Sequence, residues 1–349
     1  SELKISYFFQ SPVYNLRSKF SVGITHLGGT SMANAWKRDK NQKLLAPKTL
    51  IFLLILSIIF LFSLFFFSFS SLQNFNPNLS LNTQFPIPPF DCFKCPQSKP
   101  IIASVVENLK YPFIYSLADL GNLPEKPHKN IVRLLKGKPF RKPDISAAIQ
   151  EVLENMKAKG RDGFVVDVGA NVGMASFAAA AMGFKVLAFE PVFENLQRIC
   201  DGIWFNRVAS LVTVFEAAAS DRNGDITFHK LVGRLDNSAV SEVGARLAFK
   251  SNKEIAVQVK SIPLDELILP SQPVLLIKID VQGWENHVLK GAKKLLSRKP
   301  TEAPYLIYEE DERLLKASNS SSKEIRDFLK SVGYSKCSQH GTDAHCTKE

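Results

Sequence analysis

Between residues 144 and 332, short apolar runs alternate along the chain with segments whose apolar residues recur at helical spacing. Runs such as GFVVDVGA (163–170) and VLLIKID (274–280) are largely apolar on both faces, which is typical of strands buried in a parallel sheet. Strands that alternate with helices pack into a sheet that is covered by helices on both faces. The sequence therefore predicts an α/β fold with a doubly wound, mostly parallel sheet.

Individual elements follow from this pattern. Helices are expected at 144–159, 172–182, 193–205, 285–296 and 323–332, and strands at 163–170, 185–191, 212–218, 274–280 and 305–310. Two other runs, 225–231 and 254–260, alternate polar and apolar residues, which is typical of strands with one solvent-facing side. We expect these two strands and the polar loop between them to form a β-rich insertion.

An apolar run of 20 residues, 50–69, precedes this body and contains three serines and no charged residue. A helix of that length is about 30 Å long, which is the thickness of a bilayer core. A buried soluble helix would show a polar face, and a cleaved signal peptide would have a shorter apolar region with a small-residue cleavage site. We therefore expect an uncleaved transmembrane signal anchor at 49–70.

The charged flanks of this run predict its orientation. Five basic residues lie in the 13 residues before the run, whereas the first basic residue after it is Lys94. The positive-inside rule then predicts a cytosolic tail at 1–48 and a single-pass type II membrane protein. We expect the Golgi or another endomembrane, with the main domain in the lumen. The first methionine is Met32, and one interpretation is that residues 1–31 are an extension of the gene model that is not translated.

The rest of the chain divides by composition. The segment 71–100 is rich in Asn, Ser and Pro and predicts a stem, followed by a helical lead-in at 101–159 and the main domain at 160–349. Asn78 and Asn319 both begin N-x-S triplets, which lumenal placement would expose to glycosylation. The net charge of +11 includes +6 in residues 1–48, so the domain is only mildly basic and no nucleic-acid partner is expected.

The predicted topology places all five cysteines on the lumenal side of the membrane. Four of them lie in the stem and the tail: Cys92, Cys95, Cys337 and Cys346. In an oxidising compartment we expect these four to form two disulfides that tie the stem to the tail. A zinc site that includes His340 or His345 is the alternative, because C-x₂-C is a common ligand spacing. Cys200 lies on the apolar face of an expected helix and is expected to be buried and unpaired.

Ligands of doubly wound sheets bind beyond the carboxyl ends of the strands. The first strand runs into DVGANVG (167–173), in which Gly169 and Gly173 let the main chain approach a ligand closely. The second strand ends in Glu190, and an acid about 20 residues after a glycine-rich turn suits a pair of ribose hydroxyls.

A dinucleotide site would also place an acid after the second strand. The glycine-rich loop must therefore show whether the cofactor is NAD or S-adenosylmethionine. Its pattern is G-x-N-x-G rather than G-x-G-x-x-G, and Asp167 precedes the first glycine by two positions. A carboxylate there suits the cationic amino acid end of S-adenosylmethionine and does not suit a pyrophosphate. We therefore expect S-adenosylmethionine rather than NAD, and we assign no metal ligand to this site.

Four blocks of this sequence together resemble the FkbM-type methyltransferase family. They are VVDVGANVG (165–173), AFEP (188–191), IKIDVQGWE (277–285) with VLKGAKKLL (288–296), and LIYEE (306–310). The resemblance covers about 160–335, and the anchor and KPFRKPDISAAIQ (138–150) resemble plant members. It implies the Rossmann-like fold of class I methyltransferases, S-adenosylmethionine as cofactor, and methylation of oxygen atoms on sugars and macrolides.

The resemblance also implies roles for single residues. The loop residues that would hold the methionine part are Asp167, Gly169, Asn171 and Gly173. Glu190 would hold the ribose, and the segment after the third strand, with Ala218 and Asp221, would line the adenine. The sequence departs from the family at Gln282, where the block often has Glu, so hydrogen bonding is kept and a charge is lost.

Two acids are candidates for catalysis. Asp280 ends the fourth strand, where it could serve as a base for the acceptor or as a brace for the following turn. Glu309 ends the next strand and could orient the acceptor, and Trp284 could stack on a sugar or pack between helix and sheet. His229 and His287 are interpreted as structural residues.

The expected function is that of an O-methyltransferase. We expect it to act on a hydroxyl of a lumenal glycan, a cell-wall polysaccharide or a small molecule. A catalytically silent protein that keeps the fold and binds the cofactor or a glycan is the alternative.

Overall fold

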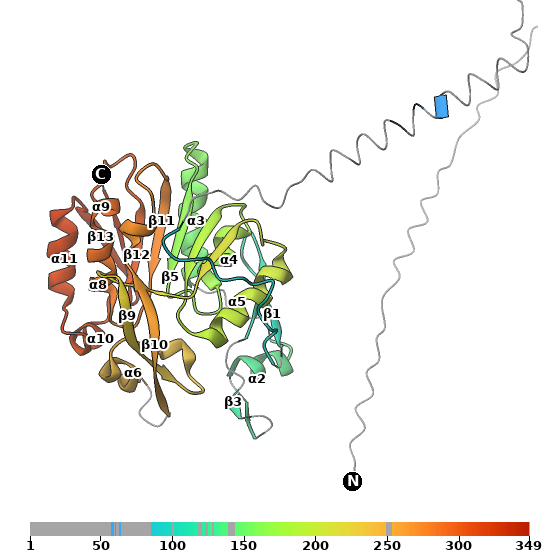
Figure 1. The fold of residues 1–349 in the computed structure, drawn as a ribbon, viewed down its shortest axis with the longest axis horizontal. Helices are drawn as coiled ribbons and strands as arrows, with labels where there is room; N and C mark the ends of the chain where they lie inside the picture. The colour runs from blue at the N-terminus through green and yellow to red at the C-terminus, as the bar shows by residue number, and fades with distance from the viewer. Residues whose placement is uncertain are drawn as a thin grey trace, which may run out of the picture. The chain divides into compact units, whose positions relative to one another are not determined.

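The computed structural model describes residues 57, 58, 60, 63, 85–99, 101–117, 121, 122, 125–127, 129–138, 144–248 and 253–348. The chain separates into two compact units, Ser1–Leu81 and Asn82–Glu349, and the second contains the sheets (Figure 1). The expected tail at 1–48 lies outside the described residues, as do nearly all of the expected span at 49–70 and the first part of the stem. Among the described residues, no helix has the length and apolar character needed to cross a membrane.

Within the described residues, the central sheet has seven strands in the order β13-β14-β12-β11-β5-β6-β7. Their bounds are β5 (Phe164–Val168), β6 (Lys185–Phe189), β7 (Val212–Phe215), β11 (Val274–Ile279), β12 (Tyr305–Glu309), β13 (Lys336–His340) and β14 (Asp343–Thr347). Five of them, from β7 to β12, run parallel, and β14 is antiparallel to both of its neighbours. The predicted doubly wound, mostly parallel sheet is therefore confirmed, and β14 makes it a mixed sheet.

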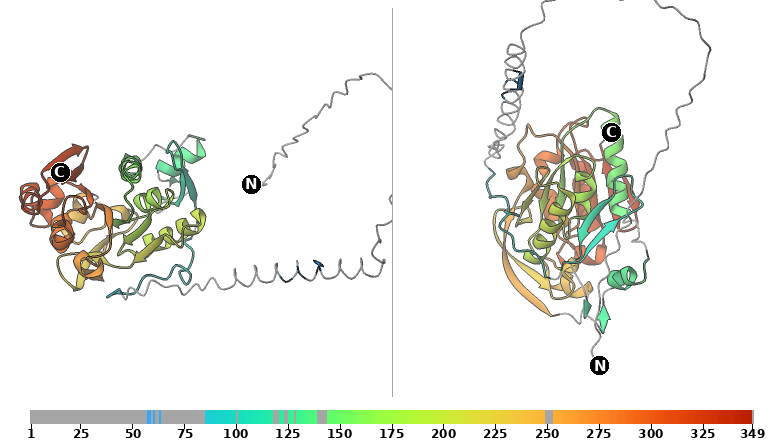
Figure 2. Two further views of the ribbon diagram at one scale, coloured as in Figure 1. Left: turned by 90° about the horizontal axis from the view of Figure 1, so that it is seen from above. Right: turned by 90° about the vertical axis from the view of Figure 1, so that its right-hand side faces the viewer.

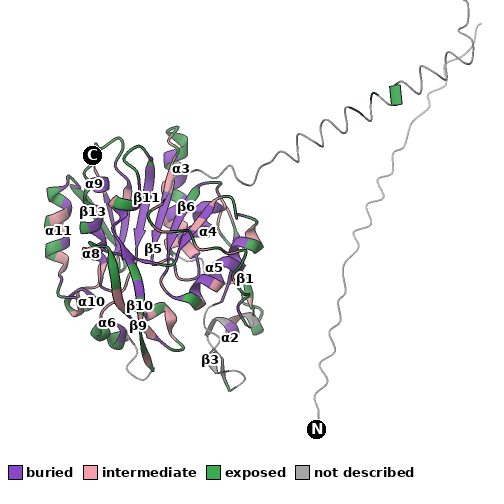
Figure 3. Cartoon of the chain, viewed as in Figure 1, coloured by how far each residue is buried: buried purple, intermediate pink, exposed green. Residues whose placement is uncertain are grey.

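Helices cover both faces of this sheet (Figure 2). On one face lie α3 (Asp144–Ala158), α4 (Met174–Ala180) and α5 (Phe193–Asn206), and on the other lie α7 (Leu264–Leu267), α8 (Glu285–Gly291), α9 (Lys293–Leu296) and α11 (Ser322–Ser331). Successive strand residues alternate between the two cores, so that Val165 packs with α3 to α5 and Val166 packs with α8 and α11. Figure 3 shows the resulting buried strands between partly exposed helices.

The helix expected at 285–296 is divided in the structure. It consists of α8 and α9, separated by Ala292 with non-helical backbone angles. Gly291 lies against the main chain at Ser220, so closely that a Cβ atom there would collide with the Ser220 carbonyl oxygen. This close packing between helix and strand explains why the segment is not one straight helix.

The predicted insertion is confirmed as a hairpin. Its strands β9 (Gly224–Leu231) and β10 (Glu254–Ile262) pair antiparallel, and β10 also pairs with β8 (Ala218–Ala219). Between β9 and β10 the chain forms a short 3₁₀ helix at Leu235–Asn237 and α6 (Glu242–Ala248).

The segment 101–159, predicted as a helical lead-in, begins instead with strands. These are β1 (Ala103–Val106), β2 (Phe113–Ser116), β3 (Gly121–Asn122) and β4 (Lys126–Pro127), which precede the short helix α2 (Lys129–Leu135) and α3. Strands of four residues are too short to show a period, which is why the sequence pattern missed them. The C-terminal hairpin of β13 and β14 was missed for a related reason, because β13 is a polar, largely exposed edge strand.

The cysteine pairing differs from the prediction. The structure joins Cys92 to Cys200 and Cys337 to Cys346, and it leaves Cys95 as a free thiol. The stem is therefore tied to α5, which carries Cys200, and not to the tail. The two tail cysteines of the zinc alternative are bonded to each other. Sequence spacing could not show this, because only the packing of the stem against α5 brings Cys92 close to Cys200.

Candidate functional site

A small cavity of about 50 Å³ lies at the carboxyl ends of β5, β6 and β11, where the strand order reverses. Five of the predicted site residues line it, namely Gly169, Asn171, Glu190, Ala218 and Asp280. The insertion closes it with residues of the 3₁₀ segment and its flanks, such as Leu235 and Ser238. The location is the one expected for a ligand of a doubly wound sheet.

The glycine loop comes close to the neighbouring strand end. Gly169 has a φ of +73°, and a Cβ atom there would collide with the carbonyl oxygen of Asp280. Only glycine adopts this conformation at so close an approach without strain. Gly173 has a φ of +88° and precedes α4, where a Cβ atom would meet the ring of Phe177. Gly173 therefore shapes the loop without lining the cavity.

Glu190 is the acid of this cavity. One of its carboxylate oxygens accepts a hydrogen bond from the main-chain N–H of Asn171 at 2.7 Å, and the other accepts from Val192 and Asn195 at 2.9 Å and 3.2 Å. Burial raises the pKa of Glu190 to about 7, although these hydrogen bonds oppose the shift. The side-chain oxygens of Asn171 and Asn195 are buried without a hydrogen-bond partner. Glu190, Asn171 and Asn195 all line the cavity, and the side-chain oxygens of all three can accept hydrogen bonds.

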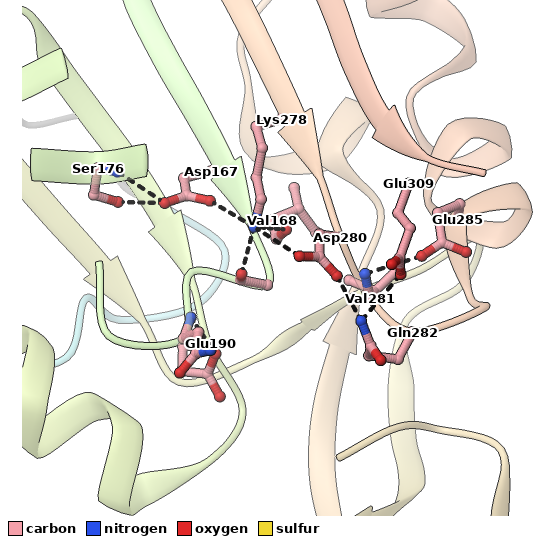
Figure 4. A network of polar contacts seen from close by, with 12 residues as sticks. Asp167, Val168, Ser176, Glu190, Lys278, Asp280, Val281, Gln282, Glu285 and Glu309 are labelled. Atoms are coloured by element: carbon pink, nitrogen blue, oxygen red, sulfur yellow. Dashed lines mark hydrogen bonds and ion pairs between the residues drawn. The ribbon is translucent and has the colours of Figure 1, made fainter. Parts of the chain in front are cut away.

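Asp167 lies behind this wall. Its side chain is 0% exposed, and it accepts hydrogen bonds from the main-chain N–H and the hydroxyl of Ser176 at 3.0 Å and 2.7 Å. Its other oxygen lies 3.3 Å from the ammonium group of Lys278 (Figure 4). Asp167 therefore lines neither this cavity nor its neighbour, and it contacts the loop through Ser176 and Lys278.

Lys278 links the two central strands, a role that the sequence analysis did not assign. Its ammonium group donates to the carbonyl oxygen of Gly169 at 2.6 Å and lies 4.0 Å from Asp280. Burial alone would lower its pKa, but the negative charges of Asp167 and Asp280 raise the pKa of Lys278 above its usual value. A single charge within the otherwise apolar run VLLIK was the sequence signal that could have identified it.

The side-chain amide of Gln282 connects the two candidate catalytic acids, Asp280 and Glu309. The side-chain NH₂ of Gln282 donates to Asp280 at 2.8 Å and to Glu309 at 3.0 Å (Figure 4). Burial, together with the negative charges of Asp280 and Glu285, raises the pKa of Glu309 well above its usual range. Glu309 is consequently held in its protonated form at neutral pH. The next residue, Glu310, pairs with Arg326 at 2.7 Å.

Glu285 holds the turn that carries Gln282. Its carboxylate accepts hydrogen bonds from the main-chain N–H groups of Val281 and Gly283 at 3.0 Å and 3.2 Å. Burial raises the pKa of Glu285 to about 7. The turn therefore has a brace other than Asp280, which weakens the interpretation of Asp280 as a purely structural residue.

A second cavity of about 340 Å³ adjoins the first. The two share Gly169, Asn171 and Asp280 as lining residues. Glu309 and Asp343 line the second cavity only. Asp280 thus lies at the boundary between the two cavities. Glu190 lines the first cavity, and Glu309, Asp343 and apolar side chains line the second.

Asp221, predicted to line the adenine, does not line either of these cavities. It pairs with His287 at 2.8 Å, and although burial opposes it, the hydrogen bond and charge of His287 lower the pKa of Asp221. Trp284 stacks on His287 with 3.7 Å between ring centroids, donates to the hydroxyl of Ser220 at 3.1 Å, and lines the first cavity. His287 thus supports a wall of the cavity from behind.

His229 lies in the insertion and lines neither of the two cavities. Its ring lies 2.5 Å from Glu254, whose other oxygen accepts from Arg246 at 2.7 Å. Glu242 also pairs with Arg246 at 2.9 Å, so this group joins α6 to the hairpin. The possible ligand atoms of His229, Glu242 and Glu254 lie close enough together to bind one metal ion. Arg246, however, forms ion pairs with both carboxylates.

No curated protein matches the chain. Several solved structures are similar in fold. One is precorrin-6y C5,15-methyltransferase from Geobacter metallireducens GS-15, with 14% identity over 60% of this chain and 90% of that chain and a TM-score of 0.33. Another is ribosomal protein L11 methylase from Lactobacillus delbrueckii subsp. bulgaricus, with 12% identity over 59% of this chain and 77% of that chain and a TM-score of 0.29. A third is monomeric WbdD, with 14% identity over 62% of this chain and 43% of that chain and a TM-score of 0.35. Similarity at this level carries no argument about what the chain acts on.

The family comparison is more specific. Residues 167–336 match the family model described as the methyltransferase FkbM domain. This span contains the glycine loop, Glu190, the insertion, and the block from Lys278 to Glu285, and it includes Glu309. The methyltransferase-like α/β fold with its mixed sheet agrees with the match. Residues 167–336 of this chain are therefore similar to the methyltransferase FkbM domain.

Proposed function

We propose that this domain uses S-adenosylmethionine to methylate a sugar hydroxyl of a lumenal glycan or cell-wall polysaccharide. The observation that carries the proposal is the position of Asp280 between two cavities, one of which is lined by Glu190, Asn171 and Asn195. A transfer reaction needs such an arrangement, because donor and acceptor must meet at one point from two directions.

The first cavity suits the cofactor in the chemistry of its lining residues. Glu190 can accept hydrogen bonds from ribose hydroxyls, and the unpaired side-chain oxygen of Asn171 can accept one from an ammonium group. Phe189, Phe228 and Val281 add apolar surface to the wall, which suits an adenine ring. The lack of a side chain at Gly169 lets the loop pack against the carbonyl oxygen of Asp280, and both residues line the cavity. The bound cofactor would supply an activated methyl group.

The second cavity suits the acceptor. Its wall combines apolar side chains, such as Ile145 and Ile307, with the carboxyl groups of Glu309 and Asp343. Carboxyl groups accept hydrogen bonds from hydroxyls, and apolar side chains can contact the C–H face of a sugar ring. The cavity therefore has the features expected of a site for a polyhydroxylated acceptor.

Asp280 is the better candidate for the base. A sugar hydroxyl is a poor nucleophile at neutral pH, and a positioned base contributes about 10²–10⁴-fold to such reactions. The Asp280 side chain is 45% exposed and accepts a hydrogen bond from Gln282, whereas Glu309 is held protonated by its raised pKa. Asp280 can accept the hydroxyl proton, and the protonated Glu309 can orient the acceptor by donating a hydrogen bond.

The lumenal location is supported by two features of the chain. The apolar run at 50–69 with its preceding basic residues favours a type II anchor, as in the plant members that the sequence resembles. The disulfides Cys92–Cys200 and Cys337–Cys346 suit an oxidising compartment such as the lumen of the secretory pathway. Glycans are abundant acceptors there.

The experiment is transfer of a labelled methyl group. The full chain in detergent is incubated with methyl-labelled S-adenosylmethionine and with glycan fractions, and label is expected on a sugar oxygen. Label on protein nitrogen or nucleic acid alone would reject the acceptor class. Cofactor binding without any transfer would favour the alternative, a catalytically silent binding protein.

A further inference from the structure

Asn319 occupies the exposed turn between α10 (Glu312–Ala317) and α11. Its φ is +54°, and its main-chain N–H donates to the carbonyl oxygen of Lys316 at 3.1 Å, while that of Ser320 donates to Leu315 at 2.9 Å. These two bonds form a Schellman cap with Asn319 in the left-handed position. The cap fixes the main chain of the turn and leaves the Asn319 side chain in solvent.

The residues that follow complete an N-x-S triplet at 319–321. The hydroxyl of Ser320 points inward, where it is buried and accepts a hydrogen bond from Asn286 at 3.2 Å. The hydroxyl of Ser321 caps α11 by accepting from the main-chain N–H of Glu324 at 3.2 Å. An attached group at Asn319 would therefore extend outward without disturbing the buried contacts of the turn.

The disulfides supply the second, independent observation. Cys92–Cys200 and Cys337–Cys346 are both formed within the described residues, and such pairs persist in the oxidising compartments where N-glycosylation takes place. The triplet of Asn78 lies outside the described residues. Asn319 is thus the triplet whose surroundings can be judged, and they are compatible with a bulky surface modification.

We propose that Asn319 carries an N-linked oligosaccharide. In the reaction a bond forms between the side-chain nitrogen of Asn319 and the anomeric carbon of an oligosaccharide supplied as a lipid-linked diphosphate. The glycosyl–phosphate bond breaks, the lipid diphosphate leaves, and the amide loses one proton. The proposal rests on the lumenal placement of the domain, which is part of the proposed function, but it does not depend on methyl transfer.

The glycan would stand next to the insertion. The hydroxyl of Ser241, just before α6, donates to the carbonyl oxygen of Ala317 at 2.6 Å, so the end of α10 contacts the element that closes the first cavity. Asn319 itself lines neither of the two cavities described above. We therefore expect the glycan to shield this edge of the domain without occupying either cavity.

The test uses the full chain, made in eukaryotic cells with Asn78→Gln so that a single triplet remains. An endoglycosidase that removes N-linked glycans is expected to lower the apparent mass by the equivalent of one glycan. Asn319→Gly keeps the left-handed cap and Ser321→Asp keeps the N-cap of α11, yet both destroy the triplet and should abolish the shift. Ser321→Thr keeps both the cap and the triplet and should retain the shift.

An unshifted band for the Asn78→Gln chain would overturn the proposal, whatever the state of its disulfides. A shift that persists in both Asn319→Gly and Ser321→Asp would also overturn it, because the glycan would then lie elsewhere. Calorimetry with S-adenosylmethionine reports on the cofactor site separately. A failure of glycosylation can thus be distinguished from a failure of the methyltransferase assignment.

Discussion

The ammonium group of Lys278 lies 3.3 Å from a carboxylate oxygen of Asp167, and this buried ion pair joins β11 to β5. The same ammonium group donates to the carbonyl oxygen of Gly169, so the pair also holds the glycine loop. The loop forms part of both cavities, whereas Asp167 lies behind it. The position of the candidate cofactor site therefore depends on a charge pair in the core of the sheet.

Asp167→Asn should destabilise the fold as well as the site. The substitution leaves the buried ammonium of Lys278 without its counter-charge, and removing one partner of a buried ion pair costs about 3–5 kcal/mol. The free energy of unfolding, measured by urea denaturation, should fall accordingly. Asp225→Asn removes one partner of the exposed pair with Lys260 and should cost far less. Equal losses in the two variants would refute the structural role of Asp167.

Glu285 should make stability depend on pH. Its pKa is about 7 in the folded protein, above the ordinary value of 4.5 for a solvated glutamate side chain, so folding favours its protonated form. The stabilisation is complete below about pH 4.5 and is lost as the pH rises through about 7. Glu285→Gln keeps an oxygen for the N–H groups of Val281 and Gly283 but cannot ionise. Unfolding free energies between pH 5 and 8 should decline less in this variant than in the unchanged chain, and parallel curves would contradict the assignment.

Peptide mapping without reduction tests the cysteine pairing. The structure predicts cross-linked peptides containing Cys92 with Cys200 and Cys337 with Cys346, and a free thiol at Cys95. The first disulfide closes a loop with a sequence separation of 108 residues, so Cys92→Ser should cost up to about 4–5 kcal/mol by the chain-entropy model. Cys95→Ser is the matched control and should have little effect on stability. A peptide linking Cys92 or Cys95 to the tail would restore the pairing expected from the sequence.

Asp280→Asn should separate turnover from binding. The variant keeps the size of the side chain and removes its basicity, so label transfer to glycans should fall by about 10²–10⁴-fold. Binding of S-adenosylmethionine should change little, because Glu190 and the amide oxygens of the first cavity are untouched. Near-normal turnover would assign Asp280 a structural role instead.

The order of elements from β5 to β12 could be predicted because each buried strand is a continuous apolar run. The start of α3 at Asp144 was predicted from apolar residues at helical spacing, and the two hairpin strands of the insertion were predicted from their alternation of polar and apolar residues. Short or polar strands gave no such signal, as β1 and β13 show. The pairing of Cys92 with Cys200 depends on tertiary packing, which sequence spacing does not contain.

The site residues that could be predicted from the sequence are those that lie at or just after the carboxyl end of a strand. Glu190, Asn171 and Asp280 meet at one cavity because parallel strands end at the same edge of the sheet. Asp167 was assigned to ligand contact because sequence cannot show on which side of the loop its carboxylate lies. Lys278 was missed because its role follows from the pairing of β11 with β5.

Calorimetric titration of the full chain in detergent with S-adenosylmethionine tests the central claim most directly. At pH 8, where Glu190 with its pKa of about 7 is ionised, one cofactor should bind per chain, and affinity should be about tenfold lower at pH 6. Glu190→Gln should weaken binding at pH 8 by about 10-fold to 100-fold, as expected for the loss of a charge-assisted hydrogen bond. A folded chain that binds no cofactor, or a Glu190→Gln variant that binds it as tightly as the unchanged chain, would contradict this account.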